Sequence, residues 1–263
     1  MSLITKIPGV IFTDSTLPKL YRDAAITSGT KFCFDAGDTY SFPAQATPAA
    51  SSLWTDLTPN NSSATFGSAP AAFLNSGFNF NPAVNGLESI QLPMSGKPAA
   101  NAAGFLFVIW LKYLAPTSSS YAGVAGYADS TSASVCAYAL DTGAANGSTI
   151  RTTINGFTGS TQPMVVGNIY QIGGCAKKLA NGTYDYYFYQ NGVLINSINT
   201  GATALGVPIV TPNPFIGVFS GFSPGAGFRA FRCLYDDTSV LANQAAITAM
   251  VLADYNANNG RFS

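Results

Sequence analysis

Short runs of apolar residues alternate with clusters of Gly, Asn, Ser, Thr and Pro along most of the 263-residue chain. Runs such as "ASVCAYAL", "STIRTTI" and "PFIGVFSG" extend over only a few residues, which is typical of strands rather than helices. Because turn-forming residues separate these runs throughout, the pattern predicts an all-β protein in which two antiparallel sheets pack as a sandwich.

The longest apolar run, "FLFVIWL" at 105–111, is followed directly by Lys112. It is much shorter than the roughly 20 apolar residues that a membrane-spanning helix requires, and no other window reaches that length. The run is rich in aromatic and β-branched residues and is bounded by Gly104 and Pro116. These features predict a strand that is buried on both faces, and no membrane insertion.

The clearest hairpin lies in "GTYDYYFYQNGVLINSI", where Asn191 and Gly192 can supply the two positive φ angles of a type I′ turn. Before this turn, aromatic residues occupy both faces of the expected strand, since successive side chains alternate. Such rows either pack across neighbouring strands or stack on sugar rings, and packing is the commoner role.

The C-terminal end differs, because apolar residues there recur with the period of a helix rather than a strand. The stripe consists of Ile247, Met250, Val251 and Tyr255. Asn243 is suited to cap the start of this helix, and Gly260 follows its end. We expect one short helix packed on the sandwich, and a second one over 17–26 with Pro18 in its first turn.

Only 9% of the residues are charged, against a norm of about 25%. Twelve basic and twelve acidic residues cancel, so the composition gives no indication of binding to nucleic acid or anionic lipid. The polar surface must therefore consist mainly of Ser, Thr, Asn and Gly. This composition suits a protein that is covered by copies of itself or by partners; an ordinary extracellular β-domain is the alternative.

Candidate chemistry is sparse. Histidine is absent, which excludes Ser–His–Asp and Cys–His catalytic arrangements. A glycosidase needs two carboxylates about 5 to 9.5 Å apart, and no compact acidic cluster is visible around the single glutamate, Glu88. We therefore expect no enzymatic activity, no catalytic residues and no cofactor.

The closest acidic pairs, Asp35 with Asp38 and Asp236 with Asp237, suit turns, because Asp bonds its own backbone two residues on. A calcium site is the alternative reading of these pairs, although no metal is expected. The four cysteines are far apart and form no CxxC pair, so small buried hydrophobes are favoured over a disulfide or a metal site. They are Cys33, Cys136, Cys175 and Cys233.

Several motifs, in their order along the chain, resemble laminin-G-like, concanavalin-A-like jelly-roll domains. "KFCFDAGDTYSF", "LWTDLTPNNSSATF" and "GFNFNP" resemble the opening strands of that family, where Trp54, Asp56 and Leu57 match a W-x-D-L motif. Thr58-Pro59-Asn60 departs from the usual Ser-Gly-Asn. "FLFVIWLKY" resembles the central strand, with Trp110 in the matching place. "YQNGVLINS" and "FRAFRCLYDDTSVLANQAAITAMVLADYN" resemble the hairpin, last strand and closing helix, so the likeness covers about residues 30–258.

The resemblance implies a two-sheet antiparallel jelly-roll sandwich of a kind common in tail, fibre and capsid-decorating proteins of bacteriophages. It implies a non-enzymatic virion structural protein of a bacteriophage, namely a tail, baseplate or fibre component, whose partners are copies of itself and other virion proteins. Such a protein would be made in the host cytoplasm, and the N-terminal "MSLITKIPGV" does not resemble a signal peptide. Host cell-surface polysaccharide is a further expected contact. A capsid decoration or head-fibre protein, a carbohydrate-binding module, a polysaccharide-degrading enzyme and a secreted adhesin are the alternatives.

Residues 1–29 lie outside the resemblance and are interpreted as an N-terminal assembly arm, residues 30–258 as the jelly-roll domain, and residues 259–263 as a tail. The arm's apolar residues would be an aggregation liability if exposed, which favours packing on a neighbouring subunit or on the chain's own sandwich; a strand added to the local sheet is the alternative. They are Leu3, Ile4, Ile7, Val10, Ile11 and Phe12.

Candidate glycan-binding residues are Tyr121, Tyr127 and Asp129 in "SSSYAGVAGYADST". Aromatic faces stack on sugar C–H groups, and a carboxylate accepts hydrogen bonds from hydroxyls. The same residues are equally suited to a strand.

Overall fold

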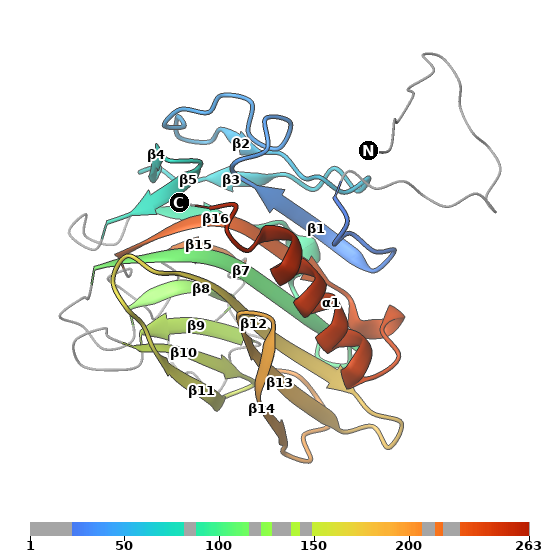
Figure 1. Ribbon diagram of the computed structural model, residues 1–263. Helices are drawn as coiled ribbons and strands as arrows, with labels where there is room; N and C mark the ends of the chain where they lie inside the picture. Colours follow the sequence, from blue (N-terminus) through green and yellow to red (C-terminus); the bar gives the residue numbers. More distant parts are fainter. Residues whose placement is uncertain are drawn as a thin grey trace, which may run out of the picture.

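The apolar run at 105–111 lies within the long strand β7 (Gly104–Ala115), which pairs on one side with β12 and on the other with β16. The computed structural model describes residues 23–81, 88–115, 122–127, 138–142, 149–206, 214–217 and 227–262. In these residues the strands form two antiparallel sheets that face each other, with one α-helix on the outside (Figure 1). The two-sheet sandwich with a C-terminal helix is thereby confirmed.

The first sheet has the strand order β14-β13-β12-β7-β16-β5-β4, and β1 also pairs with β16. Besides β7, its strands are β1 (Thr30–Asp35), β4 (Ala72–Leu74), β5 (Gly77–Phe80), β12 (Ile169–Lys178), β13 (Tyr184–Gln190), β14 (Val193–Asn199) and β16 (Gly227–Asp236).

The second sheet has the order β11-β10-β9-β8-β15-β6-β3-β2. Its strands are β2 (Leu53–Trp54), β3 (Ala64–Phe66), β6 (Ser89–Gln91), β8 (Gly123–Tyr127), β9 (Tyr138–Thr142), β10 (Thr149–Ile154), β11 (Phe157–Pro163) and β15 (Phe215–Gly217). Short 3₁₀ helices cover Met94–Gly96 (η1) and Thr238–Val240 (η3).

Both faces of β7 are buried, as its unbroken apolar sequence predicts. Phe105, Phe107 and Ile109 point into the core between the sheets. Leu106 and Val108 point the other way and pack beneath α1 (Gln244–Asn258). A central strand covered by a second sheet on one face and by a helix on the other has no room for alternating polar residues, which explains its composition.

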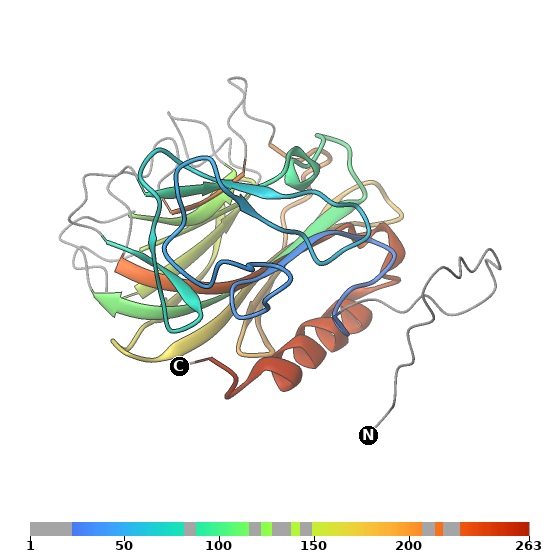
Figure 2. The same ribbon diagram turned by 90° about the horizontal axis from the view of Figure 1, so that it is seen from above.

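Helix α1 lies across the outer face of the first sheet, as the two ribbon views show (Figure 1, Figure 2). The side chain of Asn243 accepts a hydrogen bond from the backbone N–H of Ala246 at 3.1 Å, which confirms the expected cap. Ile247 and Val251 are completely buried against the sheet. The second expected helix is not found in its described part, because residues 23–26 form a turn closed by Ile26 N–H to Asp23 O at 3.2 Å.

The hairpin of β13 and β14 has φ angles of 50° at Asn191 and 78° at Gly192, as a type I′ turn requires. Tyr184, Tyr186 and Phe188 are buried in the core. The aromatic residues on the opposite face of β13 are buried beneath α1. The aromatic rows therefore pack the sandwich, which was the favoured of the two roles.

Cys33, Cys175 and Cys233 are free and buried, as expected for small apolar residues, and burial raises the pKa of the Cys33 thiol. Cys136 lies outside the described residues. Among the described residues no helix has both the length and the apolar character needed to cross a membrane.

Both ends of the described chain pack on the sandwich rather than extending from it. Ile26 belongs to a buried cluster with Cys33 and Leu234. Phe262 packs on Trp110 at the other end of the chain. Residues 23–29 thus pack on the chain's own sandwich, and the division into an arm at 1–29 and a domain at 30–258 stays a prediction. The apolar arm residues, Leu3, Ile4, Ile7, Val10, Ile11 and Phe12, lie outside the described residues, and their assembly role stays a prediction.

Candidate functional site

A pocket of about 260 Å³ lies on the outer face of the first sheet, at the C-terminal end of α1. Three parts of the chain meet there: the centre of β7, the turn before β12, and the segment that runs from the last turn of α1 towards the C-terminus. The lining residues are Trp110, Gly167, Asn168, Ile169, Tyr255, Asn258, Asn259, Gly260 and Phe262.

The apolar part of the pocket is aromatic. The rings of Trp110 and Tyr255 are stacked, with centroids 5.6 Å apart and an interplanar angle of 6°. Phe262 lies 5.4 Å from Trp110 and stacks on Phe231 at 4.9 Å. Trp110 is only 2% exposed, whereas Tyr255 is half-buried. The rings therefore form a rigid floor, and Tyr255 is the aromatic residue that a ligand can reach most easily.

The polar part consists of amide side chains and one hydroxyl. Asn168 and Asn259 are exposed, and in the described part of the chain their side chains have no protein hydrogen-bond partner; nor does the Tyr255 hydroxyl. Asn168 is nevertheless held in place, because its backbone carbonyl accepts from Tyr113 N–H at 3.0 Å and its N–H donates to Val165 O at 3.1 Å. The pocket thus offers uncommitted hydrogen-bonding side chains beside aromatic rings, and the backbone that carries Asn168 is held by hydrogen bonds.

Asp254 of α1 fixes the floor from below. Its Oδ2 accepts from the indole Nε1–H of Trp110 at 2.7 Å and from Gln171 Nε2 at 2.8 Å. Strand register places Gln171 on β12 and Arg232 on β16 opposite Trp110, so the three side chains lie side by side across the sheet. This arrangement orients the indole without leaving a buried polar atom unpaired on Asp254.

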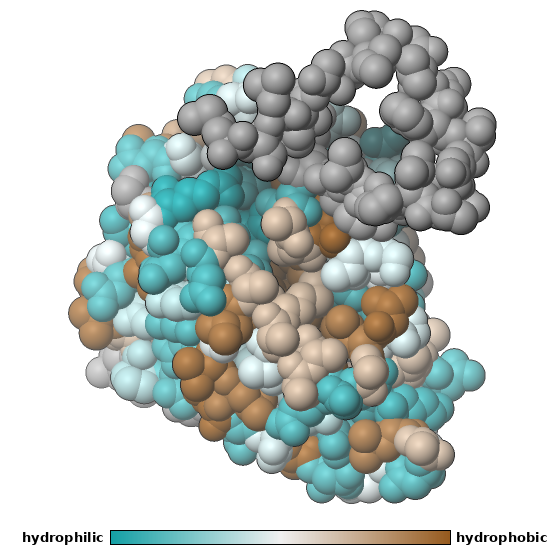
Figure 3. Space-filling view, turned by 45° about the vertical axis from the view of Figure 1, so that its right-hand side comes forward, coloured by the Kyte–Doolittle hydropathy of each residue, from teal (hydrophilic) through white to brown (hydrophobic). Residues whose placement is uncertain are grey.

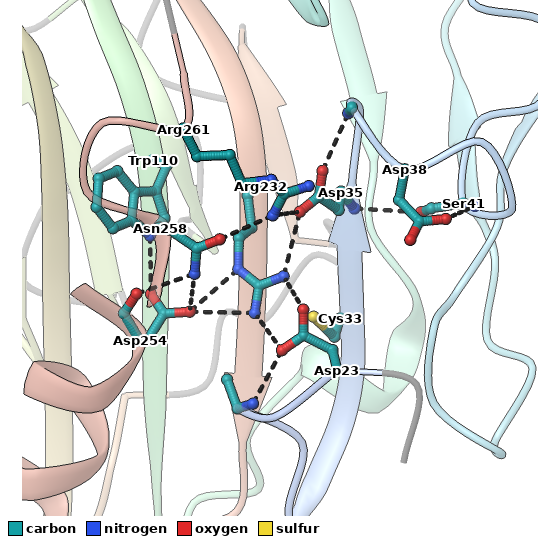
Figure 4. Close-up of polar contacts among 12 residues, drawn as sticks. Asp23, Cys33, Asp35, Asp38, Ser41, Trp110, Arg232, Asp254, Asn258 and Arg261 are labelled. Carbon is teal, nitrogen blue, oxygen red and sulfur yellow. Dashed lines mark hydrogen bonds and ion pairs between the residues drawn. The ribbon is translucent and has the colours of Figure 1, made fainter. Parts of the chain in front are cut away.

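Arg232 is the centre of a buried ion-pair network (Figure 4). Its guanidinium, which is completely buried, lies 2.8 Å from Asp23, 3.3 Å from Asp35 and 3.1 Å from Asp254. Arg261 adds a second guanidinium at 2.7 Å from Asp35. The network joins the segment before β1, strand β1, α1 and the C-terminal segment to β16.

Charge compensation by Arg232 determines the protonation of Asp23. Burial alone would raise the pKa of the Asp23 carboxyl, but the charge and hydrogen bonds of Arg232 outweigh burial and lower it below its ordinary value. Asp23 is therefore held as a carboxylate that compensates part of the charge of Arg232.

The acidic pairs singled out in the sequence have structural roles. Asp38 accepts backbone hydrogen bonds in the turn after β1, and Asp237 accepts one from Ser239 N–H at 2.9 Å. Asp236 accepts from the hydroxyls of Thr27 and Thr30, and burial raises its pKa. No group of three or more His, Cys, Asp or Glu side chains that could hold a metal ion occurs among the described residues.

Asp56 of the W-x-D-L motif is a further structural carboxylate. It accepts from the backbone N–H groups of Cys33, Thr58 and Ser62 at 2.9 to 3.1 Å. It thereby fastens the turn after β2 to β1.

Tyr127, one of the three glycan-binding residues expected from the sequence, does not line this pocket. The ring of Tyr127 on β8 is completely buried in the core, with Lys97 Nζ 5.5 Å from its centroid, so it presents no face to a ligand. Tyr121 and Asp129 lie outside the described residues, and their glycan-binding role stays a prediction. The sequence also singled out Trp110 and Tyr255, but only for packing. The one sequence signal for the pocket is the amide-rich "YNANNG" that ends the helix.

No protein-family model matches the chain, and no curated protein matches it by sequence. Among solved structures it is similar to the sialidase of Trypanosoma rangeli, with a TM-score of 0.54 and 15% identity over 87% of this chain. The receptor-binding domain of botulinum neurotoxin type G matches with a TM-score of 0.54 and 11% identity over 88% of this chain. An arabinofuranosidase bound to arabinofuranosyl-xylobiose matches with a TM-score of 0.50 and 10% identity over 77%.

This chain spans 33% of the sialidase chain, 52% of the toxin domain and 50% of the arabinofuranosidase chain. At such identities the likeness shows a shared β-sandwich fold. None of these three structures is a phage protein, so they give no support to the virion role expected from the sequence.

The comparisons contradict the expectation that the chain is not an enzyme, because two of the three similar structures are enzymes. The sequence argument excluded more classes of enzyme than the absence of histidine allows. The absence of histidine removes His-dependent triads, but glycoside hydrolysis needs only two carboxylates, and the folded chain can bring distant acidic residues together. For example, folding brings Asp23, Asp35 and Asp254, which are far apart in sequence, together around Arg232.

Proposed function

We propose that the chain is a glycan-binding β-sandwich module that holds one sugar residue in the pocket at the C-terminal end of α1. The observation that carries this proposal is the combination of a stacked Trp110–Tyr255 floor with uncommitted amides from Asn168 and Asn259. A sugar ring presents C–H groups on its faces and hydroxyls around its edge. It therefore needs an apolar aromatic surface and a few convergent hydrogen-bonding groups, which this pocket provides.

The size of the pocket supports a small ligand. Its volume of about 260 Å³ lies just below the roughly 300–1,000 Å³ that is common for pockets holding drug-sized molecules. One sugar residue, with the rest of a glycan extending into solvent, fits this scale better than a long buried chain.

The similar structures support the proposal only through their shared β-sandwich fold. Two of them are enzymes whose names refer to sugars, bound to an inhibitor or to an oligosaccharide, and the third is a receptor-binding domain of a toxin. Since this chain spans half or less of most of those chains, the proposal concerns sugar recognition by this module. A setting in a virion, with copies of itself as partners, stays a prediction that rests on the sequence resemblance.

Replacing Tyr255 by Ala is expected to weaken sugar binding at least about tenfold, because it removes the accessible aromatic ring and one hydroxyl from the pocket. Alanine is a good helix former, so α1 is retained. Binding is measured by screening the purified chain on an array of neutral and acidic glycans, followed by calorimetric titration with the best monosaccharide found.

The matched control is Tyr40→Ala, which removes another partly exposed tyrosine that does not line the pocket. The control variant should bind as the unmodified chain does. Equal loss of binding in both variants, or no loss in Tyr255→Ala, would place the sugar elsewhere.

A further inference from the structure

We propose that the pocket selects an uncharged sugar residue and discriminates against sugars that carry a carboxylate, such as sialic or uronic acids. This inference rests on the proposed function and specifies its ligand class. The pocket's lining and the buried charges behind it are independent observations that lead to it.

Among the described residues, no lysine or arginine lines the pocket. Recognition of a carboxylate in proteins relies on Arg, Lys or a cluster of N–H donors, and a guanidinium suits it best because it binds both oxygens at once. The uncommitted groups here are two amides and a phenol, each of which both donates and accepts hydrogen bonds. Such groups match hydroxyls, which also both donate and accept, better than a carboxylate, which only accepts.

The guanidinium of Arg261 lies close to the pocket in sequence, between Gly260 and Phe262, but it is already paired. Its Nη1 is 2.7 Å from Asp35 Oδ2 and 2.7 Å from Asn258 Oδ1, and its central carbon lies 5.1 Å from the centroid of the Phe262 ring. Release of this cation to a ligand would leave the buried carboxylate of Asp35 with less compensation, which is unfavourable.

The ion-pair network behind the aromatic floor has more carboxylates than guanidiniums. Asp23, Asp35 and Asp254 contribute three carboxylates to the network, whereas Arg232 and Arg261 contribute two guanidiniums. Asp254 bonds directly to the Trp110 indole, and Asn258 of the lining donates to Asp254 Oδ1 at 3.2 Å. An anionic sugar in the pocket therefore lies one side chain away from a network whose described members carry one net negative charge.

A carboxylate that enters the pocket loses part of its hydration without gaining a cation, and it is repelled by the network. Two like charges about 4 Å apart in water-like surroundings shift an equilibrium by about fivefold, and the effect falls with distance. Since one side chain separates the sugar from the network, we expect an acidic sugar to bind about twofold to fivefold more weakly than its neutral counterpart, and added salt to reduce this ratio.

The test uses matched sugars that differ only at C6, namely methyl glucoside with methyl glucuronide, and methyl galactoside with methyl galacturonide, together with N-acetylneuraminic acid. The full chain is titrated with each at low and at high salt. Weaker binding of the acidic member, with a ratio that falls as salt rises, is the expected result. Equal or tighter binding of the acidic sugar would overturn the inference and leave the proposed function intact. Absence of binding for all five sugars and for every sugar on the array would overturn the proposed function itself.

A variant that adds a positive charge at the pocket tests the electrostatic origin of the selectivity independently. Asn168→Lys places a cation at the exposed rim, so the ratio of neutral to acidic affinity should fall by about fivefold or more. Asn168→Gln, the matched control, keeps the amide and should leave the ratio unchanged. A ratio that does not differ between the two variants would contradict the electrostatic origin of the selectivity.

Discussion

Arg232→Met is expected to lower the free energy of unfolding by about 3–5 kcal/mol, because removal of one partner leaves buried carboxylates without compensation. Arg232 is completely buried and ion-paired to three aspartates, two of which are themselves buried. Methionine fills a similar volume, so the loss arises from charge rather than from a cavity. Urea denaturation at neutral pH, followed by tyrosine and tryptophan fluorescence, measures the change.

The matched control for this variant is Lys31→Met, which breaks the partly exposed ion pair with Asp237 at 3.4 Å. Exposed pairs contribute about 0–1 kcal/mol, so this variant should unfold close to the unmodified chain. A loss of similar size in both variants, or a negligible loss in Arg232→Met, would show that the network does not hold the outer face together.

Gly104→Ala is expected to be comparably destabilising, by about 3 kcal/mol or more, because both backbone conformation and space oppose a side chain there. Gly104 begins β7 with φ at 133°, and a Cβ atom would lie 2.0 Å from the carbonyl oxygen of Ala176 on the neighbouring strand. Since that obstacle is backbone, the β7–β12 pairing has to shift to admit a methyl group. Thermal unfolding of the variant measures the loss.

Gly182→Ala measures how much stability is lost from the backbone conformation alone, without a steric clash. Gly182 also has a positive φ, 86°, but a Cβ atom there meets nothing within 4 Å. This variant should lose only about 1 kcal/mol. Equal losses at the two positions would contradict the close approach of β7 and β12 described above.

The elements with strong local signals could be predicted from the sequence. The run at 105–111 is too short for a membrane helix and too apolar for an edge strand, which leaves a central strand. Asn191-Gly192 is the preferred sequence of a type I′ turn, and Asn243 is a preferred helix cap. In each case the residues that decide the structure are neighbours in sequence, so the pattern contains the answer.

The candidate site could not be predicted, because it is assembled from segments that are distant in sequence. Trp110 lies on β7, Asn168 in the turn before β12 and Tyr255 on α1, and each taken alone is explained by packing or by a turn. The register irregularity in β16 between Ala230 and Arg232 adds to the difficulty. Strict alternation would place Phe231 and Arg232 on opposite faces, whereas both lie under the helix and the C-terminal segment.

Asp23 illustrates the same limit on a smaller scale. The sequence around it predicted a helix, yet its carboxylate is held 2.8 Å from Arg232, more than two hundred residues away. The pairing follows from tertiary structure, and local propensity is readily overridden by it. The exclusion of enzymes failed for a related reason, since composition does not show which acidic residues the fold brings together.

The proposed sugar site is tested most directly by the two tryptophan indole N–H signals in a ¹H–¹⁵N spectrum of the full chain. Trp110 forms the floor of the pocket, whereas Trp54 is completely buried in the core between the sheets. The signals are assigned with a Trp54→Phe variant, and a neutral monosaccharide chosen from the array is titrated into the high millimolar range. We expect the Trp110 signal to shift along a saturable curve while the Trp54 signal stays in place. A Trp110 signal that does not move while the sugar binds, or a Trp54 signal that moves equally, would contradict the site proposed for this chain.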